Sequence, residues 1–253
     1  MNTGIVTKEH MTMLRIGARI EESRSYIRNY QAGYTVKELK LKAWDEQWFG
    51  FIPESIFVRL IPAFHSRFGN YPEMVNVIQN GITKGLESYD FKMICNFHIQ
   101  ISDPYYRWFS GDYIPNRLDN GLQEITSTTT AVDFNTKFKK NIKANTLKHF
   151  AVNLLNSAND TGLLKGTKLR VTQTPTVTVF FLGYLIYTLG SFDFPMADLI
   201  NSPFIKSIIS EKPRLRSLLT EGQHKGWWEY NWDMNMFNLK LSYQTIKHWF
   251  KET

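Results

Sequence analysis

The clearest periodic pattern in the chain lies between residues 145 and 158, where large apolar residues recur at intervals of three and four. This spacing predicts a helix with one apolar face, which Asn145 or Thr146 can cap and which Gly162 ends. The apolar positions are Leu147, Phe150, Ala151, Leu154, Leu155 and Ala158. The opposite face has no carboxylate and carries Lys148, His149, Asn153 and Asn156.

This helix lies within a strongly basic stretch that runs from residue 137 to residue 170. The stretch holds eight Lys or Arg residues and one acid, Asp160, so its net charge of +7 equals that of the whole chain. The remaining 22 basic and 22 acidic residues cancel. After the helix and a turn, Lys168 to Gln173 has the pattern of a short basic strand. Helix, turn and basic strand is the pattern of a winged helix, and it favours double-stranded DNA as the partner.

The winged-helix hypothesis gives the residues of the basic stretch three roles. One set is predicted to hold phosphates beside the helix, and it consists of Lys139, Lys140 and Lys143. A second set faces the groove, where the Asn side chains can bond base edges, and it consists of Lys148, Asn153 and Asn156. His149, beside them, is a candidate phosphate contact, with a plain surface histidine as the alternative. The wing carries Lys165, Lys168 and Arg170. The alternative for every set is a polar, solvated surface with no nucleic-acid partner.

The N-terminal part of the chain shows further helical patterns. Residues 8–31, residues 36–48 and residues 54–68 each have a partial apolar face, and Pro62 is predicted to kink the third helix. Two helices around a Gly-containing turn can form a helix-turn-helix, which would present Arg59 and Arg67 outward as DNA contacts. Two ordinary packed helices are the alternative.

The sequence predicts two halves in a mainly α protein. Ser127 to Thr130 is the expected linker, so residues 1–125 form a helical domain and residues 126–253 a winged-helix-like domain. The second half also contains an apolar run at residues 177–189, which is too short for a membrane span of about 20 residues and predicts a buried helix.

Near the C-terminus, the hydrophobic period changes from helical to alternating. Trp228 to Met236 predicts a half-buried strand that pairs with Asn238 to Leu241 in a short β-hairpin. The aromatic side chains of this region are predicted to pack in the core or against a partner protein, with base stacking as a further alternative.

Residues with known catalytic or metal-binding spacing are not found. Cys95 is the only cysteine, the six histidines are far apart, and there is no phosphate-binding Gly-rich loop or nucleophile elbow. We therefore expect no enzyme activity, no cofactor and no metal site. The N-terminus lacks the layout of a signal peptide, so the expected location is the cytoplasm, without membrane contact.

Several segments spread over residues 8–190 form a further set: Gly17–Glu22, Glu54–Leu60 with Arg67, Asn96–His98 with Asp103–Phe109, and Asn145–His149 followed by Thr161–Leu164. Together these segments resemble the BrxA family of bacterial BREX phage-resistance systems. The resemblance implies a mostly helical, NusB-like protein that is associated with DNA and acts beside a methyltransferase and ATPases of the same system.

Three functional hypotheses follow from these observations. The first is a non-enzymatic protein of phage defence that binds double-stranded DNA mainly through phosphates. The second is a scaffold that docks onto a larger defence enzyme, such as the methyltransferase or an ATPase, through the aromatic C-terminal hairpin. The third is RNA binding, which the likeness to NusB would allow.

Overall fold

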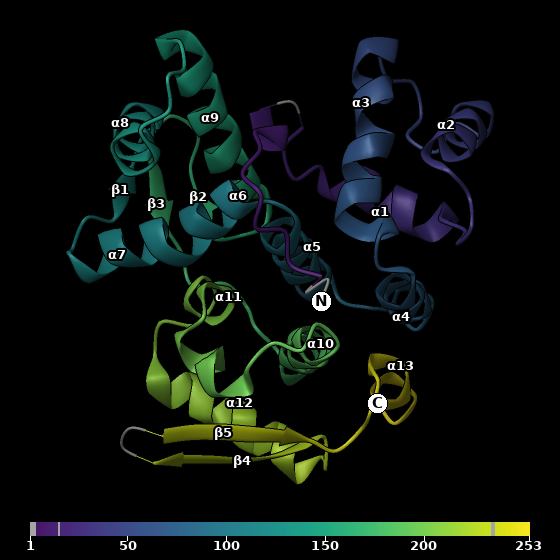
Figure 1. Ribbon diagram of the computed structural model, residues 1–253, viewed down its shortest axis with the longest axis vertical. Coiled ribbons are helices and arrows are strands. Elements are labelled where there is room, and N and C mark those ends of the chain that lie inside the picture. The colour runs from purple at the N-terminus through teal and green to yellow at the C-terminus, as the bar shows by residue number, and fades with distance from the viewer. Residues whose placement is uncertain (1–3, 15, 234–235) are drawn as a thin grey trace.

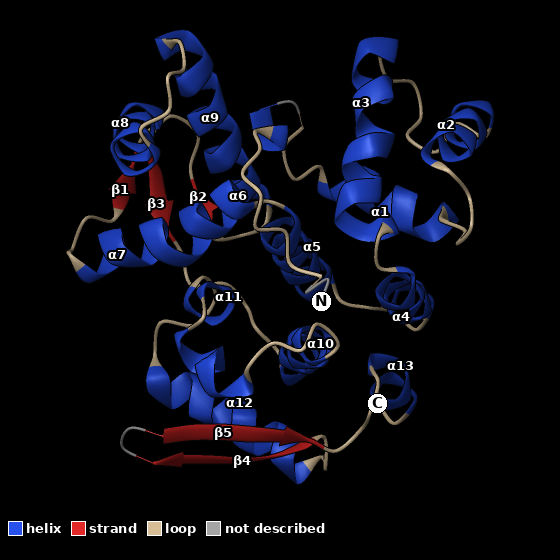
Figure 2. Ribbon diagram, in the orientation of Figure 1, coloured by secondary structure: helices blue, strands red, loops and turns tan. Residues whose placement is uncertain are grey.

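Helices make up most of the protein, and three groups of them surround a shared core (Figures 1 and 2). The structure, a computed structural model, describes residues 4–14, 16–233 and 236–253. The expected mainly α fold with a C-terminal β-hairpin is confirmed. The first group consists of the 3-10 helix η1 (Thr12–Leu14), α1 (Ile20–Asn29), α2 (Val36–Asp45), α3 (Glu54–Phe64), the π-helix η2 (His65–Gly69), α4 (Pro72–Thr83) and α5 (Ser88–Ser102).

The middle group combines helices with a small antiparallel sheet. It consists of α6 (Pro104–Trp108), the π-helix η3 (Phe109–Tyr113), α7 (Ile114–Asp119), β1 (Glu124–Ile125), α8 (Ser127–Phe138), α9 (Ala144–Asp160), β2 (Leu164–Lys165) and β3 (Arg170–Thr172). The strand order is β1-β3-β2, with Ile125 opposite Arg170 and Leu164 opposite Thr172. Strands from both sides of the expected boundary near residue 125 therefore pair in one sheet.

The third group carries the hairpin. It consists of α10 (Val179–Gly190), the 3-10 helix η4 (Met196–Asn201), α11 (Pro203–Lys206), α12 (Lys212–His224), β4 (Trp228–Asp233), β5 (Met236–Leu241) and α13 (Ile246–Lys251). Trp228 pairs with Leu241 and Trp232 with Phe237 across the hairpin. Trp227 and Trp228 are buried, so these two indoles belong to the core.

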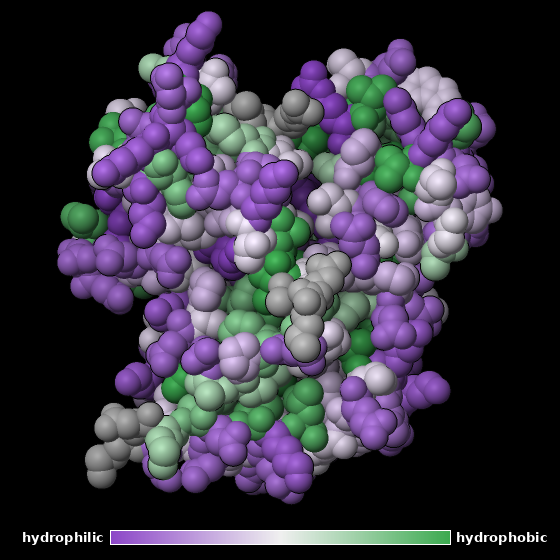
Figure 3. Space-filling model, in the orientation of Figure 1, coloured by the Kyte–Doolittle hydropathy of each residue, from purple (hydrophilic) through white to green (hydrophobic). Residues whose placement is uncertain are grey.

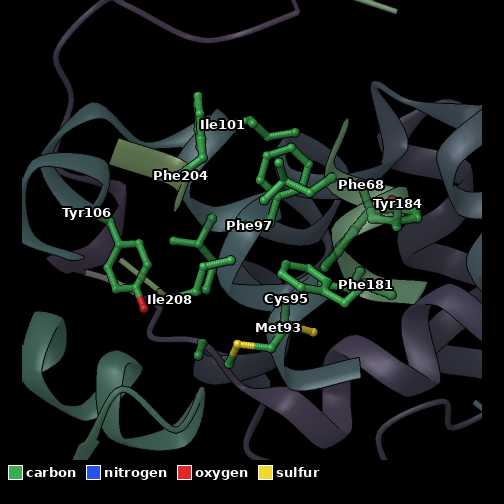
Figure 4. Packing of buried hydrophobic residues seen from close by; sticks show 14 of the residues in the cluster. Phe68, Met93, Cys95, Phe97, Ile101, Tyr106, Phe181, Tyr184, Phe204 and Ile208 are labelled. Carbon is green, nitrogen blue, oxygen red and sulfur yellow. The ribbon is translucent and has the colours of Figure 1, made fainter. Parts of the chain in front are cut away.

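Two helices that are buried on nearly every side, α5 and α10, form the centre of the molecule. The prediction of a buried helix at residues 177–189 is confirmed, because an apolar helix is stable in water only when its whole surface is covered. Figure 4 shows Phe97 of α5 among the buried hydrophobic side chains of the core. Its ring centroid lies 6.4 Å from that of Tyr184 and 5.5 Å from that of Phe204.

Two local predictions are corrected by the backbone. The helix expected at residues 8–31 is confined to α1, because Arg19 has a left-handed backbone (φ 52°) that an α-helix does not accommodate. The linker expected at Ser127–Thr130 is instead the first turn of α8. Thr126 caps this turn, since its hydroxyl accepts from the Thr129 N–H (3.2 Å) while the Thr129 hydroxyl accepts from the Thr126 N–H (3.2 Å).

Candidate nucleic-acid interface

An aromatic cluster holds α8 and α9 in place above α6. Phe134 of α8 is fully buried, and its ring centroid lies 5.0 Å from that of Phe150 in α9 and 4.9 Å from that of Tyr105 in α6. Phe138, at the end of α8, lies 4.8 Å from Tyr105 and 5.2 Å from Trp108. Contacts of this kind stabilise beyond their buried area. The turn between α8 and α9 is therefore flanked by helices that this aromatic cluster packs together.

The turn itself presents lysines to solvent. Lys139 ends α8 in a left-handed conformation (φ 48°), and its N–H donates to the carbonyl of Asn135 (2.8 Å). Ile142 packs against the core and anchors the middle of the turn. Lys143 stands at the N-cap of α9, so the helix begins at Ala144, before the Asn145 or Thr146 cap that the sequence predicts. Lys139 and Lys143 are both exposed.

The amphipathic pattern of α9 is confirmed. Its six predicted apolar positions are all buried, with Leu147 the most accessible at 8 %. On the other face, Lys148, His149 and Asn156 are exposed and Asn153 is half-buried. The second half of this helix is partly covered, because the Ala18 N–H donates to the Ser157 hydroxyl (3.0 Å). The open part of α9 is therefore its N-terminal half.

The hairpin of β2 and β3 follows α9 directly. Its turn, residues 166–169, is tight: Gly166 has φ 107°, and a Cβ there would lie 2.3 Å from the carbonyl oxygen of Leu169. Lys165 and Lys168 are exposed on this hairpin, as expected for a wing.

Arg170 does not lie on the exposed wing, contrary to expectation. Only 9 % of the residue is exposed, and one guanidinium nitrogen donates to the side-chain oxygen of Asn156. Burial lowers the pKa of Arg170, while nearby Asp160 opposes that shift. Arg170 faces inward because it lies directly opposite Ile125, which is fully buried, and opposite residues of paired strands share one face of the sheet. The contact joins the hairpin to α9 and also engages the amide oxygen of Asn156 that was expected to meet a base.

Lys140 is the one lysine of the turn that has a close acidic partner among the described residues. Its ammonium lies 2.6 Å from a carboxylate oxygen of Glu9, which also accepts from the Tyr105 hydroxyl (3.0 Å). This contact raises the pKa of Lys140 and lowers that of Glu9. Neither Glu9 nor Tyr105 was among the predicted site residues, and no local sequence pattern brings residue 9 to residue 140.

Five exposed lysines on α9, the turn directly before it and the hairpin after it have no carboxylate within ion-pair distance among the described residues. They are Lys139, Lys143, Lys148, Lys165 and Lys168. Figure 3 shows long hydrophilic side chains that project above α8 and α9. Because lysines without a nearby carboxylate attract anions, we call these five residues the basic face.

The predicted second site around α2 and α3 is not supported for Arg67. Arg59 is exposed on α3, but only 3 % of Arg67 is exposed. The Arg67 guanidinium donates to the carbonyl oxygens of Ile16 (2.9 Å), Gly17 (2.9 Å) and Ala18 (3.3 Å). These carbonyls precede α1 and need donors, and the π-helix after Pro62 carries Arg67 to them. Arg67 therefore points into the fold, and not outward as the sequence had predicted for a DNA contact.

The described residues contain no group of three or more His, Cys, Asp or Glu that could hold a metal ion. None of the described helices is long and apolar enough to cross a membrane. Comparison of the sequence with models of protein families and with curated proteins gives no match.

Proposed function

We propose that the protein is a non-enzymatic, cytoplasmic protein that binds double-stranded DNA, mainly through phosphate contacts. The observation that carries this proposal is the basic face, whose five lysines stand on α9, the turn before it and the hairpin after it. Lysines in such positions neutralise phosphates and release counterions, which gives affinity with little dependence on base sequence.

The connectivity of the middle group supports duplex DNA in particular. The order α7, β1, α8, α9, β2, β3 with the sheet order β1-β3-β2 is that of winged-helix domains. In helix-turn-helix proteins the second helix enters the major groove with its N-terminal residues forward. In this protein the corresponding part of α9 is the open part, with Lys148 and His149 exposed. The engagement of Asn156 by Arg170 favours backbone contacts over base contacts.

A salt titration tests the proposal. We expect fluorescence anisotropy with a labelled duplex to show affinity that falls steeply with salt, because five phosphate contacts correspond to a slope of about −4.5 in log K against log salt. The triple variant Lys139→Glu, Lys143→Glu, Lys148→Glu should lose at least about tenfold in affinity at low salt.

A second triple variant shows whether a loss of affinity comes from the basic face itself or only from the change in net charge. Lys225, Lys240 and Lys251 are exposed near the hairpin and α13, so their change to Glu alters the charge equally elsewhere. Equal losses in the two triple variants would contradict the proposed site. Competition with a structured RNA distinguishes duplex DNA from RNA, the partner that the NusB likeness allows.

A protein partner is the second candidate, favoured by an exposed apolar patch between α2 and α3. Phe51 is 97 % exposed, Trp44 51 % and Leu41 59 %. The resemblance to BrxA makes a methyltransferase or ATPase of the same system the proposed partner. Phe51→Ser should weaken co-purification with that protein while leaving DNA binding unchanged; retention of both would remove this candidate.

A further inference from the structure

The N-terminal segment, residues 4–14, lies along α5 and α6 and ends beside α9, and we call it the strap (Figure 1). The Val6 N–H donates to the carbonyl of Ile101 (2.8 Å), and Arg107 donates to the carbonyl of Val6 (2.8 Å). Further along, a ring nitrogen of His10 lies 2.9 Å from the carbonyl oxygen of Ser102. These contacts flank Glu9 on both sides and fix the backbone that presents its carboxylate.

The Glu9 carboxylate is bound by two hydrogen-bond donors that belong to other parts of the fold. One carboxylate oxygen lies 2.6 Å from the Lys140 ammonium and also accepts a hydrogen bond from the Tyr105 hydroxyl (3.0 Å). Tyr105 is held by the aromatic cluster under α8 and α9, and its ring centroid lies 4.8 Å from that of Phe138. Tyr105 is therefore positioned by the fold rather than by Glu9.

A phosphate oxygen of DNA has the same requirements as this carboxylate oxygen. Lys and Tyr side chains are both common donors to the nucleic-acid backbone. Lys140 also stands between Lys139 and Lys143, two members of the basic face that have no acidic partner among the described residues. The carboxylate thus fills an anion position in the middle of the proposed phosphate-binding turn.

We propose that Glu9 is an intramolecular competitor of DNA phosphate, an autoinhibitory contact that bound DNA displaces from Lys140. This inference rests on the proposed function and adds its regulation. The side chains of Lys140 and Glu9 are 38 % and 43 % exposed. Exposed pairs of this kind are weak, so the competitor reduces affinity by up to about fivefold rather than abolishing binding.

The test compares two variants of the full-length protein that each lose one paired carboxylate. Glu9→Gln frees Lys140 and keeps an oxygen that can accept from Tyr105. Glu73→Gln is the matched control, because Glu73 pairs with Lys247 (3.1 Å), joining α4 to α13, with both side chains about half exposed. Each substitution changes the net charge by one. Affinity for a labelled duplex is measured by anisotropy at several salt concentrations.

We expect Glu9→Gln to bind the duplex about two- to fivefold more tightly than Glu73→Gln, with the same salt slope, because Lys140 neutralises a phosphate in both complexes. Lys140→Gln should lower affinity more in the Glu9→Gln background than in the wild type, where the same substitution also removes the competing pair with Glu9. Equal affinities for Glu9→Gln and Glu73→Gln would overturn the inference while leaving the proposed function intact. If neither the wild type nor Glu9→Gln shows salt-dependent binding, both the function and the inference fail.

Discussion

Replacement of Arg67 gives the sharpest test of the structural role assigned to this residue. Arg67→Met removes a buried cation that donates to the carbonyl oxygens of Ile16, Gly17 and Ala18 and replaces it with a side chain of similar length. Burial lowers the pKa of Arg67 to about 10, so the guanidinium is charged at neutral pH. The substitution therefore removes charge-assisted hydrogen bonds, which are the stronger kind.

The expected loss follows from the carbonyls of Ile16 and Gly17, because that of Ala18 still accepts from the Ser23 hydroxyl (3.2 Å). Each buried acceptor left without a donor costs about 1–3 kcal/mol, and the release of a buried charge offsets part of the sum. We therefore expect the free energy of unfolding to fall by about 3 kcal/mol, which corresponds to a decrease of about 6–12 °C in Tm for a chain of this size.

Thermal unfolding followed by circular dichroism measures this decrease, and Arg59→Met supplies the control. Arg59 is exposed, so its replacement should change the free energy of unfolding by no more than about 0.5 kcal/mol. An unchanged Tm for Arg67→Met, together with weakened DNA binding, would refute the structural role and restore Arg67 as a contact residue.

Three further predictions concern stability. Burial lowers the pKa of His98 to about 4, below the ordinary 6.5, so the unfolded state takes up the proton first as the pH falls. The free energy of unfolding should therefore decline by about 3 kcal/mol between about pH 6.5 and 4, and His98→Gln should flatten this decline in urea titrations. Gly111→Ala should destabilise the fold strongly, because a Cβ there would lie 2.5 Å from the carbonyl oxygen of Pro203. Gly81→Ala in α4, where a Cβ would make ordinary 3.7 Å contacts, should instead raise the free energy of unfolding by up to about 1 kcal/mol, as measured by calorimetry. Thr126→Ala should lower the unfolding free energy by about 1 kcal/mol, and an unchanged Tm would show that its cap of α8 contributes nothing.

Short-range periodicity accounts for the features that were predicted correctly. The apolar face of α9, the buried α10 and the hairpin of β4 and β5 each follow from spacings within fewer than about 20 residues. The lysines of the basic face were found in the same way, because charge within one stretch is visible without a fold. The linker predicted at Ser127–Thr130 was wrong because Thr residues such as Thr126 and Thr129 suit a loop and a helix cap equally.

Contacts between distant residues account for the features that were missed. Arg67 looked like an outward charge on a helix face until the carbonyls of residues 16–18, about 50 positions earlier, were found to need its donors. Arg170 resembled a wing residue because nothing nearby shows that it lies opposite a buried residue of β1. The contact between Glu9 and Lys140 joins residues 131 positions apart, and spacing carries no information on such a pair.

The central place of β3 decides how the protein can be divided for experiments. β1 lies before the expected domain boundary and covers one edge of β3. A fragment that starts at residue 126 would leave Arg170–Thr172 with an open edge, and open edges invite aggregation. A smaller piece intended for crystallisation with a duplex should therefore start upstream of Glu124 and include α6, whose Tyr105 supports α8 and α9.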